Sequence, residues 1–201
     1  MKHNPFRARQ LYPGRLPYFF PSGVDVNELI QEFLDNSCQG QIVGPHGSGK
    51  STLLFLLADE FQRRDYQVST VRLSPPNRRL PPIVEPNSPR CVLIVDGCEQ
   101  ASWWERRRFI RQSHQLGWGL LASTHRSLGL PTLWETNVTH ETARRIVDAL
   151  IHIDKPPSVE NTDNKEFAVP PALITELLDQ HRGDMREVLF SLYDWFQRRE
   201  S

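Results

Sequence analysis

The sequence predicts an α/β fold in which a parallel β-sheet spans residues 40–136 and a small all-helical region follows. Two observations predict this fold. Short apolar runs alternate with stretches of helical periodicity, which is the pattern of parallel strands joined by crossover helices. In addition, residues 91–96 (CVLIVD) form a continuous apolar run, as expected for a strand that is buried on both faces.

The single elements follow from apolar spacing and from residues that break helices. Strands are expected at 40–43, 66–73, 91–96, 118–124 and 131–136. Helices are expected at 24–34, 51–64, 101–117, 139–153, 170–181 and 183–199. Gly117 is the expected stop of the third helix, and Thr139 or Thr136 is the expected N-cap of the fourth. Six prolines within residues 75–89 predict a loop, as does the polar segment 154–167.

Composition limits the class of protein. The chain has 201 residues, enough for one domain with a core or for one domain plus a small appendage. Lys+Arg and Asp+Glu are equal at 24 each, which argues against a strongly electrostatic nucleic-acid binder, so nucleic acid is not an indicated partner. No apolar run reaches the length of a signal peptide or a membrane span. We therefore expect a soluble, cytoplasmic protein with no membrane partner.

The three cysteines, Cys38, Cys91 and Cys98, are odd in number and form no CxxC pair. We therefore expect neither a disulfide framework nor a zinc site. Cys91 and Cys98 flank an apolar strand and are interpreted as small core residues.

The stretch GPHGSGKST, residues 44–52, matches the phosphate-binding pattern G-x-x-x-x-G-K-[ST] known as the P-loop. An expected strand precedes it and an expected helix follows it. Glycines suit this place because backbone N–H groups must point inward around a phosphate, and the helix N-terminus adds partial positive charge. Lys50 would reach the β- and γ-phosphates of bound ATP, and the hydroxyl of Ser51 would ligate Mg²⁺. The predicted nucleotide-binding residues are Gly44, Pro45, His46, Gly47, Ser48, Gly49, Lys50, Ser51 and Thr52.

The run CVLIVDGCEQ resembles a Walker B strand, which ends in an acidic residue. Asp96 would hold the Mg²⁺ ion together with Ser51. Glu99 lies three residues further on and could polarise an attacking water as a general base. The DGCE spacing resembles the D-G-x-D/E form of NACHT-like signalling ATPases. Two plainer interpretations stay open, a strand-end turn residue for Asp96 and a solvated helix cap for Glu99.

Three more residues resemble the nucleotide sensors of additional-strand P-loop ATPases. Thr124 and His125 end the strand at 118–124, where sensor 1 contacts the γ-phosphate or the lytic water. The stretch 183–186 (GDMR) resembles the G-[ND]-x-R pattern of sensor 2, in which Arg186 would neutralise charge on the γ-phosphate. The alternatives are a threonine that caps a turn and an exposed helix arginine.

Together, residues 40–198 resemble a small AAA+ or STAND-type ATPase module. The resemblance implies a three-layer αβα P-loop NTPase core with parallel strand order 5-1-4-3-2 and a C-terminal helical lid. It divides the chain into an N-terminal arm (1–22), a core (23–137) and a lid (138–201). In the arm, Phe6, Tyr18 or Phe20 would stack on adenine, or the arm would pack on the protein as a hydrophobic strap.

The resemblance implies an ATP-binding protein, a Mg²⁺-dependent ATPase that couples nucleotide state to its lid, to a protein partner or to a homo-oligomer. Because Glu99 does not directly follow Asp96, a nucleotide-dependent switch or scaffold without significant hydrolysis is the alternative. A small-molecule kinase is less favoured, since its lid would normally lie within the core and carry clustered arginines. No arginine finger can be placed, although the basic candidates are Arg107, Arg108, Arg111 and Arg126. A solvated helix face explains 105–111 (ERRRFIR) equally well.

Overall fold

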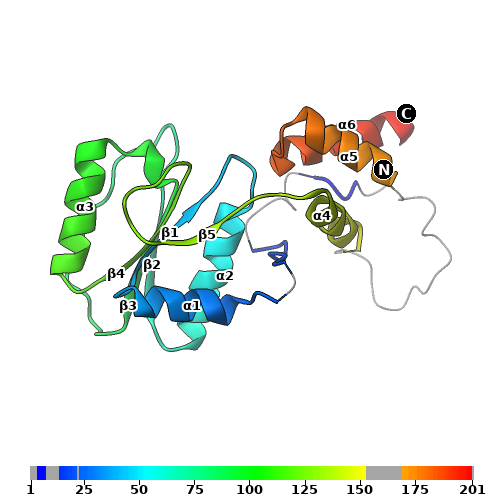
Figure 1. The fold of residues 1–201 in the computed structure, drawn as a ribbon. Helices are drawn as coiled ribbons and strands as arrows, with labels where there is room; N and C mark the ends of the chain where they lie inside the picture. The colour runs from blue at the N-terminus through cyan, green and yellow to red at the C-terminus, as the bar shows by residue number, and fades with distance from the viewer. Residues whose placement is uncertain (1–3, 8–13, 22, 153–168, 201) are drawn as a thin grey trace. The chain divides into compact units, whose positions relative to one another are not determined.

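A computed structural model describes residues 4–7, 14–21, 23–152 and 169–200 of the chain. These residues fall into two compact units. Residues 20–45 and 50–136 form an α/β unit, and the described parts of 1–19, 46–49 and 137–201 form a helical unit (Figure 1). The loop expected at 154–167 lies outside the described residues, as do parts of the arm. Within the described residues, no helix combines the length and the apolar character needed to cross a membrane.

The α/β unit contains five strands, all paired in parallel. Their bounds are β1 Gln39–Val43, β2 Gln67–Arg72, β3 Cys91–Asp96, β4 Gly119–Thr124 and β5 Thr132–Glu135. The order β2-β3-β4-β1-β5 is the predicted order 5-1-4-3-2 read from the other edge, so that prediction is confirmed. Val43 pairs with Thr124, and Arg72 pairs with Asp96. The carboxyl ends of the central strands therefore meet at one edge of the sheet.

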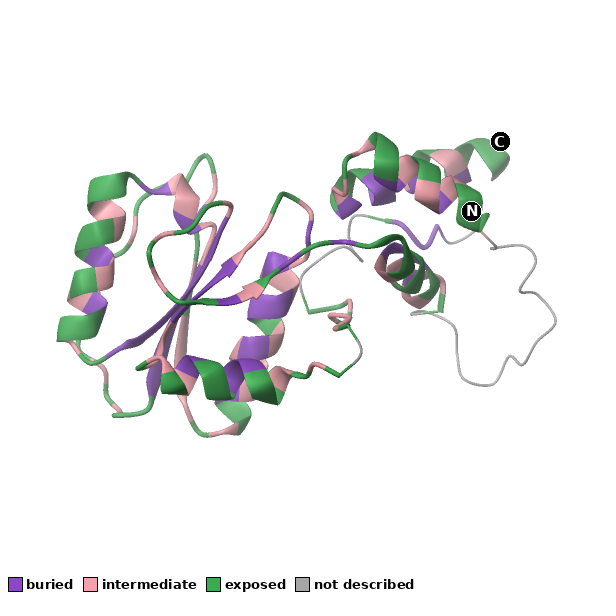
Figure 2. Cartoon of the chain, in the orientation of Figure 1, coloured by how far each residue is buried: buried purple, intermediate pink, exposed green. Residues whose placement is uncertain are grey.

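Helices cover both faces of this sheet (Figure 1). Helices α1 (Val26–Asp35) and α2 (Lys50–Arg63) pack together on one face, and α3 (Trp103–Gln115) packs against β4 on the other. On the first face the rings of Phe33 and Phe61 meet edge to face at 5.1 Å. On the second face, buried Phe109 of α3 packs with Leu93 and Leu120. The strands β3 and β4 are buried along nearly their whole length, as the continuous apolar runs predicted (Figure 2).

Both ends of α3 have a local cause in the sequence. Ser102 is the N-cap, and its side chain and that of Glu105 form a reciprocal capping box. Gly117, the predicted stop, adopts a positive φ of 78° just beyond the helix. Because this conformation favours glycine, the chain leaves the helix there and enters β4.

The helical unit contains α4 (His140–His152), α5 (Pro171–Gln180) and α6 (Met185–Glu200). Phe6 is 1% exposed in the core of this unit, and its ring packs edge to face on Phe196 at 6.4 Å. Asn4 beside it donates a hydrogen bond to the Tyr193 carbonyl at 3.3 Å. Phe6 therefore packs as a hydrophobic strap within the helical unit, whereas the expectation was a strap on the 23–137 core, and a ring buried among these helices cannot stack on adenine. Of the two candidate caps, Thr139 caps α4, since its hydroxyl accepts from the Thr142 amide at 3.1 Å.

Candidate functional site

The P-loop joins the carboxyl end of β1 to the start of α2. The strand ends at Val43 and the helix begins at Lys50, so residues 44–49 form the loop. Gly47 and Gly49 adopt φ values of +66° and +94°, which side chains other than glycine rarely accept. These two glycines allow the loop to turn directly into the N-terminus of α2, where the backbone amides of the first helical turn and the helix dipole attract an anion.

The side chain of Lys50, the first residue of α2, folds back against this loop. Its side chain is buried, with the residue 8% exposed. The ammonium Nζ donates to the carbonyl oxygens of Gly44 at 2.8 Å and Pro45 at 2.5 Å. The loop therefore holds a positive charge among its own backbone groups, at the place where the motif predicts contact with phosphate.

Glu99, His125 and the P-loop are joined by a chain of contacts. Glu99 lies on η2 (Cys98–Gln100), a short helical turn directly after β3, and His125 follows β4. The imidazole Nε2 lies 3.0 Å from Oε1 of Glu99, and Nδ1 lies 2.9 Å from the Gly44 carbonyl oxygen. Nδ1 is also 3.3 Å from Nζ of Lys50. One imidazole thus links the predicted general base to the first residue of the P-loop and to its lysine.

The second carboxylate oxygen of Glu99 has a different environment. Oε2 is buried, and no hydrogen-bond donor among the described residues reaches it. A buried acceptor without a donor costs about 1–3 kcal/mol, so such atoms call for an explanation. Because Oε2 is enclosed, a bound water or substrate could donate a proton or a hydrogen bond to it only after the side chains around it move.

Asp96 is held by its neighbour strand. Its Oδ1 accepts from the Ser123 hydroxyl at 2.7 Å, and Ser123 in turn accepts from the Gly97 amide at 2.9 Å. Arg72 lies 3.4 Å from Oδ2. Ser123 is fully buried and orients the carboxylate, a role that the sequence analysis did not foresee. The sequence contained one signal for this role. Ser123 comes one residue before Thr124, and because successive side chains of a strand point to opposite faces, the two side chains serve different neighbours.

Thr124 is buried and uses its hydroxyl locally. It donates to the Arg126 carbonyl at 2.8 Å and accepts from the Arg126 amide at 3.4 Å. These two bonds agree with the interpretation of a threonine that caps a turn, and a sensor role for Thr124 stays a prediction.

Arg186 lies in the helical unit, exposed in the first turn of α6. Its amide donates to the Asp184 carboxylate at 3.0 Å, so Asp184 caps that helix. Its predicted role as sensor 2 stays a prediction.

The predicted Mg²⁺ ligands are Ser51, in the first turn of α2, and Asp96, at the end of β3. No hydrogen bond joins them within the described residues. A hydroxyl and a carboxylate suit Mg²⁺, which usually takes only one or two protein oxygens and completes its shell with phosphate and water. Across the described part of the chain, no three His, Cys, Asp or Glu side chains gather as a metal site, so any larger protein ligand set is absent there.

Cys91 and Cys98 are buried, as the sequence predicted, and all three cysteines are free thiols. Burial raises the pKa of the Cys98 thiol to about 11. The Cys98 side chain therefore stays protonated at neutral pH and is a packing group beside Glu99 rather than a nucleophile.

Comparisons with known proteins give relatives by structure alone. No protein-family model matches the chain, and no curated protein is detectably similar to it in sequence. Among solved structures, AMPPCP-bound DnaA from Aquifex aeolicus is 16% identical, with a TM-score of 0.51, over 85% of this chain and 61% of that one. The K64R mutant of RuvB from Thermotoga maritima is 14% identical, with a TM-score of 0.52, over 83% of this chain and 57% of that one.

The chain thus spans about 60% of the length of these two structures. At such low identity the likeness concerns the fold, and DnaA and RuvB share the fold of AAA+ P-loop ATPases. The predicted strand order, the P-loop between β1 and α2, and the C-terminal helices agree with it. The chain has the fold of the AAA+ P-loop ATPases.

Proposed function

We propose that the chain binds ATP with Mg²⁺ and hydrolyses it, coupling its nucleotide state to the C-terminal lid, a protein partner or a second copy. The observation that carries this proposal is the chain of contacts from Lys50 and Gly44 through His125 to Glu99. In this proposal residues 23–137 are the nucleotide-binding core, 138–201 the lid and 1–22 the arm. That the similar DnaA structure carries AMPPCP supports a nucleotide as the ligand.

Each residue of the core has a distinct task. The amides of the P-loop and the Lys50 ammonium hold the phosphates through charge-assisted hydrogen bonds. Ser51 and Asp96 hold Mg²⁺, which neutralises charge on the phosphate oxygens when it is bound. Ser123 keeps the Asp96 carboxylate in one orientation through its 2.7 Å bond. Of the predicted sensors, Arg186 belongs to the lid and Thr124 to the core.

The proton transfer falls to Glu99. A water oxygen attacks the γ-phosphorus, and the bond from that phosphorus to the β–γ bridging oxygen breaks, giving ADP and phosphate. The proton that the water loses passes to Oε2 of Glu99, the oxygen without a donor. His125 acts as a positioning residue, because it holds Oε1 and anchors the carboxylate to the Gly44 carbonyl.

A nucleotide-dependent switch is the second candidate, and a specific observation favours it. Gly97 and Cys98 separate Glu99 from Asp96, and His125 engages one of the two Glu99 oxygens. A base that stays bound to His125 would leave ATP in place, so ATP binding rather than turnover would set the state of the protein.

The replacement Glu99→Gln separates the two candidates. For an ATPase, we expect kcat for phosphate release to fall about 100-fold or more, since general bases contribute about 10²–10⁴-fold. ATP affinity, measured by calorimetry, should change by less than about threefold, because the amide keeps the shape of the side chain. Glu32→Gln on the exposed face of α1 is the matched control and should leave both values unchanged.

Equal turnover in the wild type and Glu99→Gln would remove Glu99 from the mechanism. Tight ATP binding without turnover in the wild type would establish the switch instead.

A further inference from the structure

Two neighbouring tryptophans at the start of α3 are exposed. Trp103 is 49% and Trp104 is 77% accessible. Their rings contact each other edge to face, with centroids 4.4 Å apart and an interplanar angle of 80°. Tryptophan is usually largely buried, because its ring removes a large apolar area from water. Two exposed indoles side by side therefore indicate an interaction surface.

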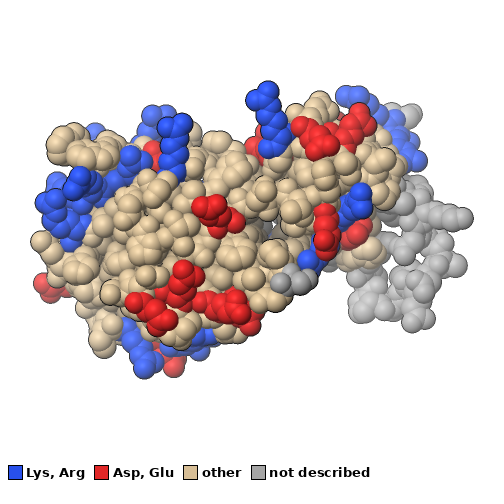
Figure 3. All heavy atoms as spheres, viewed as in Figure 1, with Lys and Arg blue, Asp and Glu red and all other residues tan. Residues whose placement is uncertain are grey.

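The same helix carries arginines without acidic partners. Trp103, Arg107 and Arg111 are spaced four residues apart and share one face of α3. The Arg107 guanidinium lies 5.0 Å from the centre of the Trp103 ring, and Arg108 is exposed beside it. Within the described residues, none of these three arginines forms an ion pair with a carboxylate. Figure 3 shows Lys and Arg side chains gathered on the part of the α/β unit where Figure 1 places α3.

Glu105, the only acidic residue of α3, takes part in the capping box at the start of that helix. Hydrogen bonds from Ser102 hold the pKa of the Glu105 carboxyl below its ordinary value, with a smaller contribution from the charge of Arg79. Arg79 comes from the proline-rich loop before β3, so that loop brings a further positive charge to the start of α3. Glu105 keeps its negative charge, but the arginines around the tryptophans, Arg79, Arg107 and Arg108, outnumber it, so this surface is cationic on balance.

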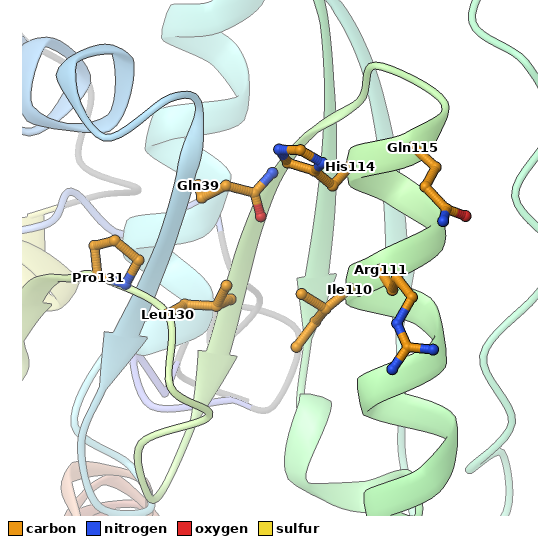
Figure 4. A pocket seen from close by; sticks show the side chains of 7 residues that line it. All are labelled: Gln39, Ile110, Arg111, His114, Gln115, Leu130 and Pro131. Carbon is orange, nitrogen blue, oxygen red and sulfur yellow. The ribbon is translucent and has the colours of Figure 1, made fainter.

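An open hollow lies at the other end of α3 (Figure 4). Its volume is about 460 Å³, and Ile110, Leu130 and Pro131 supply apolar lining. Arg111 and His114 also line it, so Arg111 belongs both to the arginine row and to the hollow. A ligand that lies along α3 would contact the two tryptophan rings, then the arginines, and then the apolar lining of the hollow.

We propose that this surface, Trp103, Trp104, Arg107, Arg108, Arg111 and the hollow beside Arg111, docks an acidic segment of a protein partner. Carboxylates of the segment pair with the arginines, and an apolar side chain of the segment fills the hollow or covers the indoles. Tryptophan and arginine are the residues that most often dominate the energy of protein interfaces. Charge complementarity selects an acidic occupant, because Arg107, Arg108 and Arg111 have no carboxylate partner among the described residues and outnumber Glu105, the one acidic residue of α3.

The ring geometry favours a protein over single-stranded nucleic acid. Stacking of successive bases needs open ring faces in parallel. Here the two indoles stand edge to face, and Arg107 covers a face of Trp103.

Selection from a display library of random peptides, of about 12 residues each, tests the proposal on the immobilised full chain. We expect the enriched peptides to contain more Asp and Glu than the library and at least one large apolar residue. A synthesised enriched peptide should bind Arg107→Glu about tenfold more weakly than the wild type, with affinity falling as salt rises. Arg90→Glu, an exposed charge reversal on the loop before β3, is the matched control and should bind like the wild type.

The double variant Trp103→Ala/Trp104→Ala should also lose about tenfold or more in peptide affinity while keeping its circular dichroism spectrum, because both rings are exposed. Failure to enrich acidic peptides, or equal binding to Arg107→Glu and Arg90→Glu, would overturn the proposal. Tighter, tryptophan-dependent binding of a thymidine oligonucleotide would assign the surface to nucleic acid. Tryptophan-dependent self-association in sedimentation would assign it to a second copy.

Lys50→Ala should leave peptide affinity unchanged. This variant therefore tests the proposed docking surface independently of the proposed nucleotide site.

Discussion

Helices α2 and α3 cover opposite faces of the same sheet but use their charged side chains differently (Figure 1). At the end of α2 the arginines are paired with carboxylates of that helix. Arg63, the last residue of α2, lies 2.5 Å from Asp59, and Arg64, directly after the helix, lies 3.1 Å from Glu60. The arginines of α3 have no such pairs within the described residues, and two tryptophans beside them are exposed.

This difference indicates which part of each helix has a functional role. The outer charges of α2 are paired in its last turns, and its functional part is its N-terminus, where the Lys50 ammonium contacts the P-loop. Helix α3 is anchored to the sheet by Phe109, and its outer arginines Arg107, Arg108 and Arg111 have no carboxylate partner within the described residues. We infer that α2 serves the nucleotide through one end, whereas α3 serves a partner through one side.

The largest effect that would test this contrast is on stability within α3. Phe109→Ala should lower the free energy of unfolding by about 3–5 kcal/mol, because a buried ring leaves a cavity. Trp104→Ala should change it by less than about 0.5 kcal/mol, as is usual for exposed positions. Urea denaturation measures both values. A large loss for Trp104→Ala would mean that this ring packs into the fold and is not kept for a partner.

An intermediate effect concerns the end of α2 and its link to Glu99. His125→Ala should lower kcat for ATP about tenfold while KM changes little, because Glu99 loses its anchor but the phosphate contacts remain. His125→Gln should recover part of kcat, since an amide can still donate to the carboxylate. Steady-state phosphate release measures this split. A change in KM alone would show that His125 serves binding rather than positioning.

The smallest effect separates paired from unpaired arginines. Arg63→Ala on α2 should cost about 0.3–0.5 kcal/mol at low salt, the usual value of such helix pairs. Arg108→Ala on α3 should cost close to nothing, because no carboxylate is lost. Thermal unfolding at low and at high salt measures the difference, which should disappear as salt screens the pairs. Equal losses for both variants would remove the contrast between the helices.

The sequence predicted those parts of the molecule that depend on local patterns. The strands, the helices and the P-loop follow from apolar periodicity and from one nine-residue motif, in which Gly47 and Gly49 have a purely local backbone reason. Asp96 and Glu99 could be placed at the sheet edge because parallel strands end together. The strand order came from the family resemblance and was confirmed.

The remainder depends on contacts between distant segments. Ser123 orients Asp96 from another strand, and Phe6 reaches the core beside Phe196, across almost the whole chain. No local pattern reports such pairs. The exposure of Trp103 and Trp104 was also open, because apolar residues at 103, 104, 109 and 110 of α3 could have faced the sheet. Only the packing of Phe109 shows which side of the helix is inside.

The central claim is that the P-loop and Lys50 hold the phosphates of a nucleotide. Calorimetric titration of ATP with Mg²⁺ into the full chain tests it most directly, with Lys50→Ala as the variant and Arg63→Ala, at the other end of α2, as the control. We expect saturable binding by the wild type and by Arg63→Ala, and about 10–100-fold weaker binding by Lys50→Ala, the value of a lost charged hydrogen bond. Absence of binding by the folded wild type, or equal affinity in Lys50→Ala, would contradict the account.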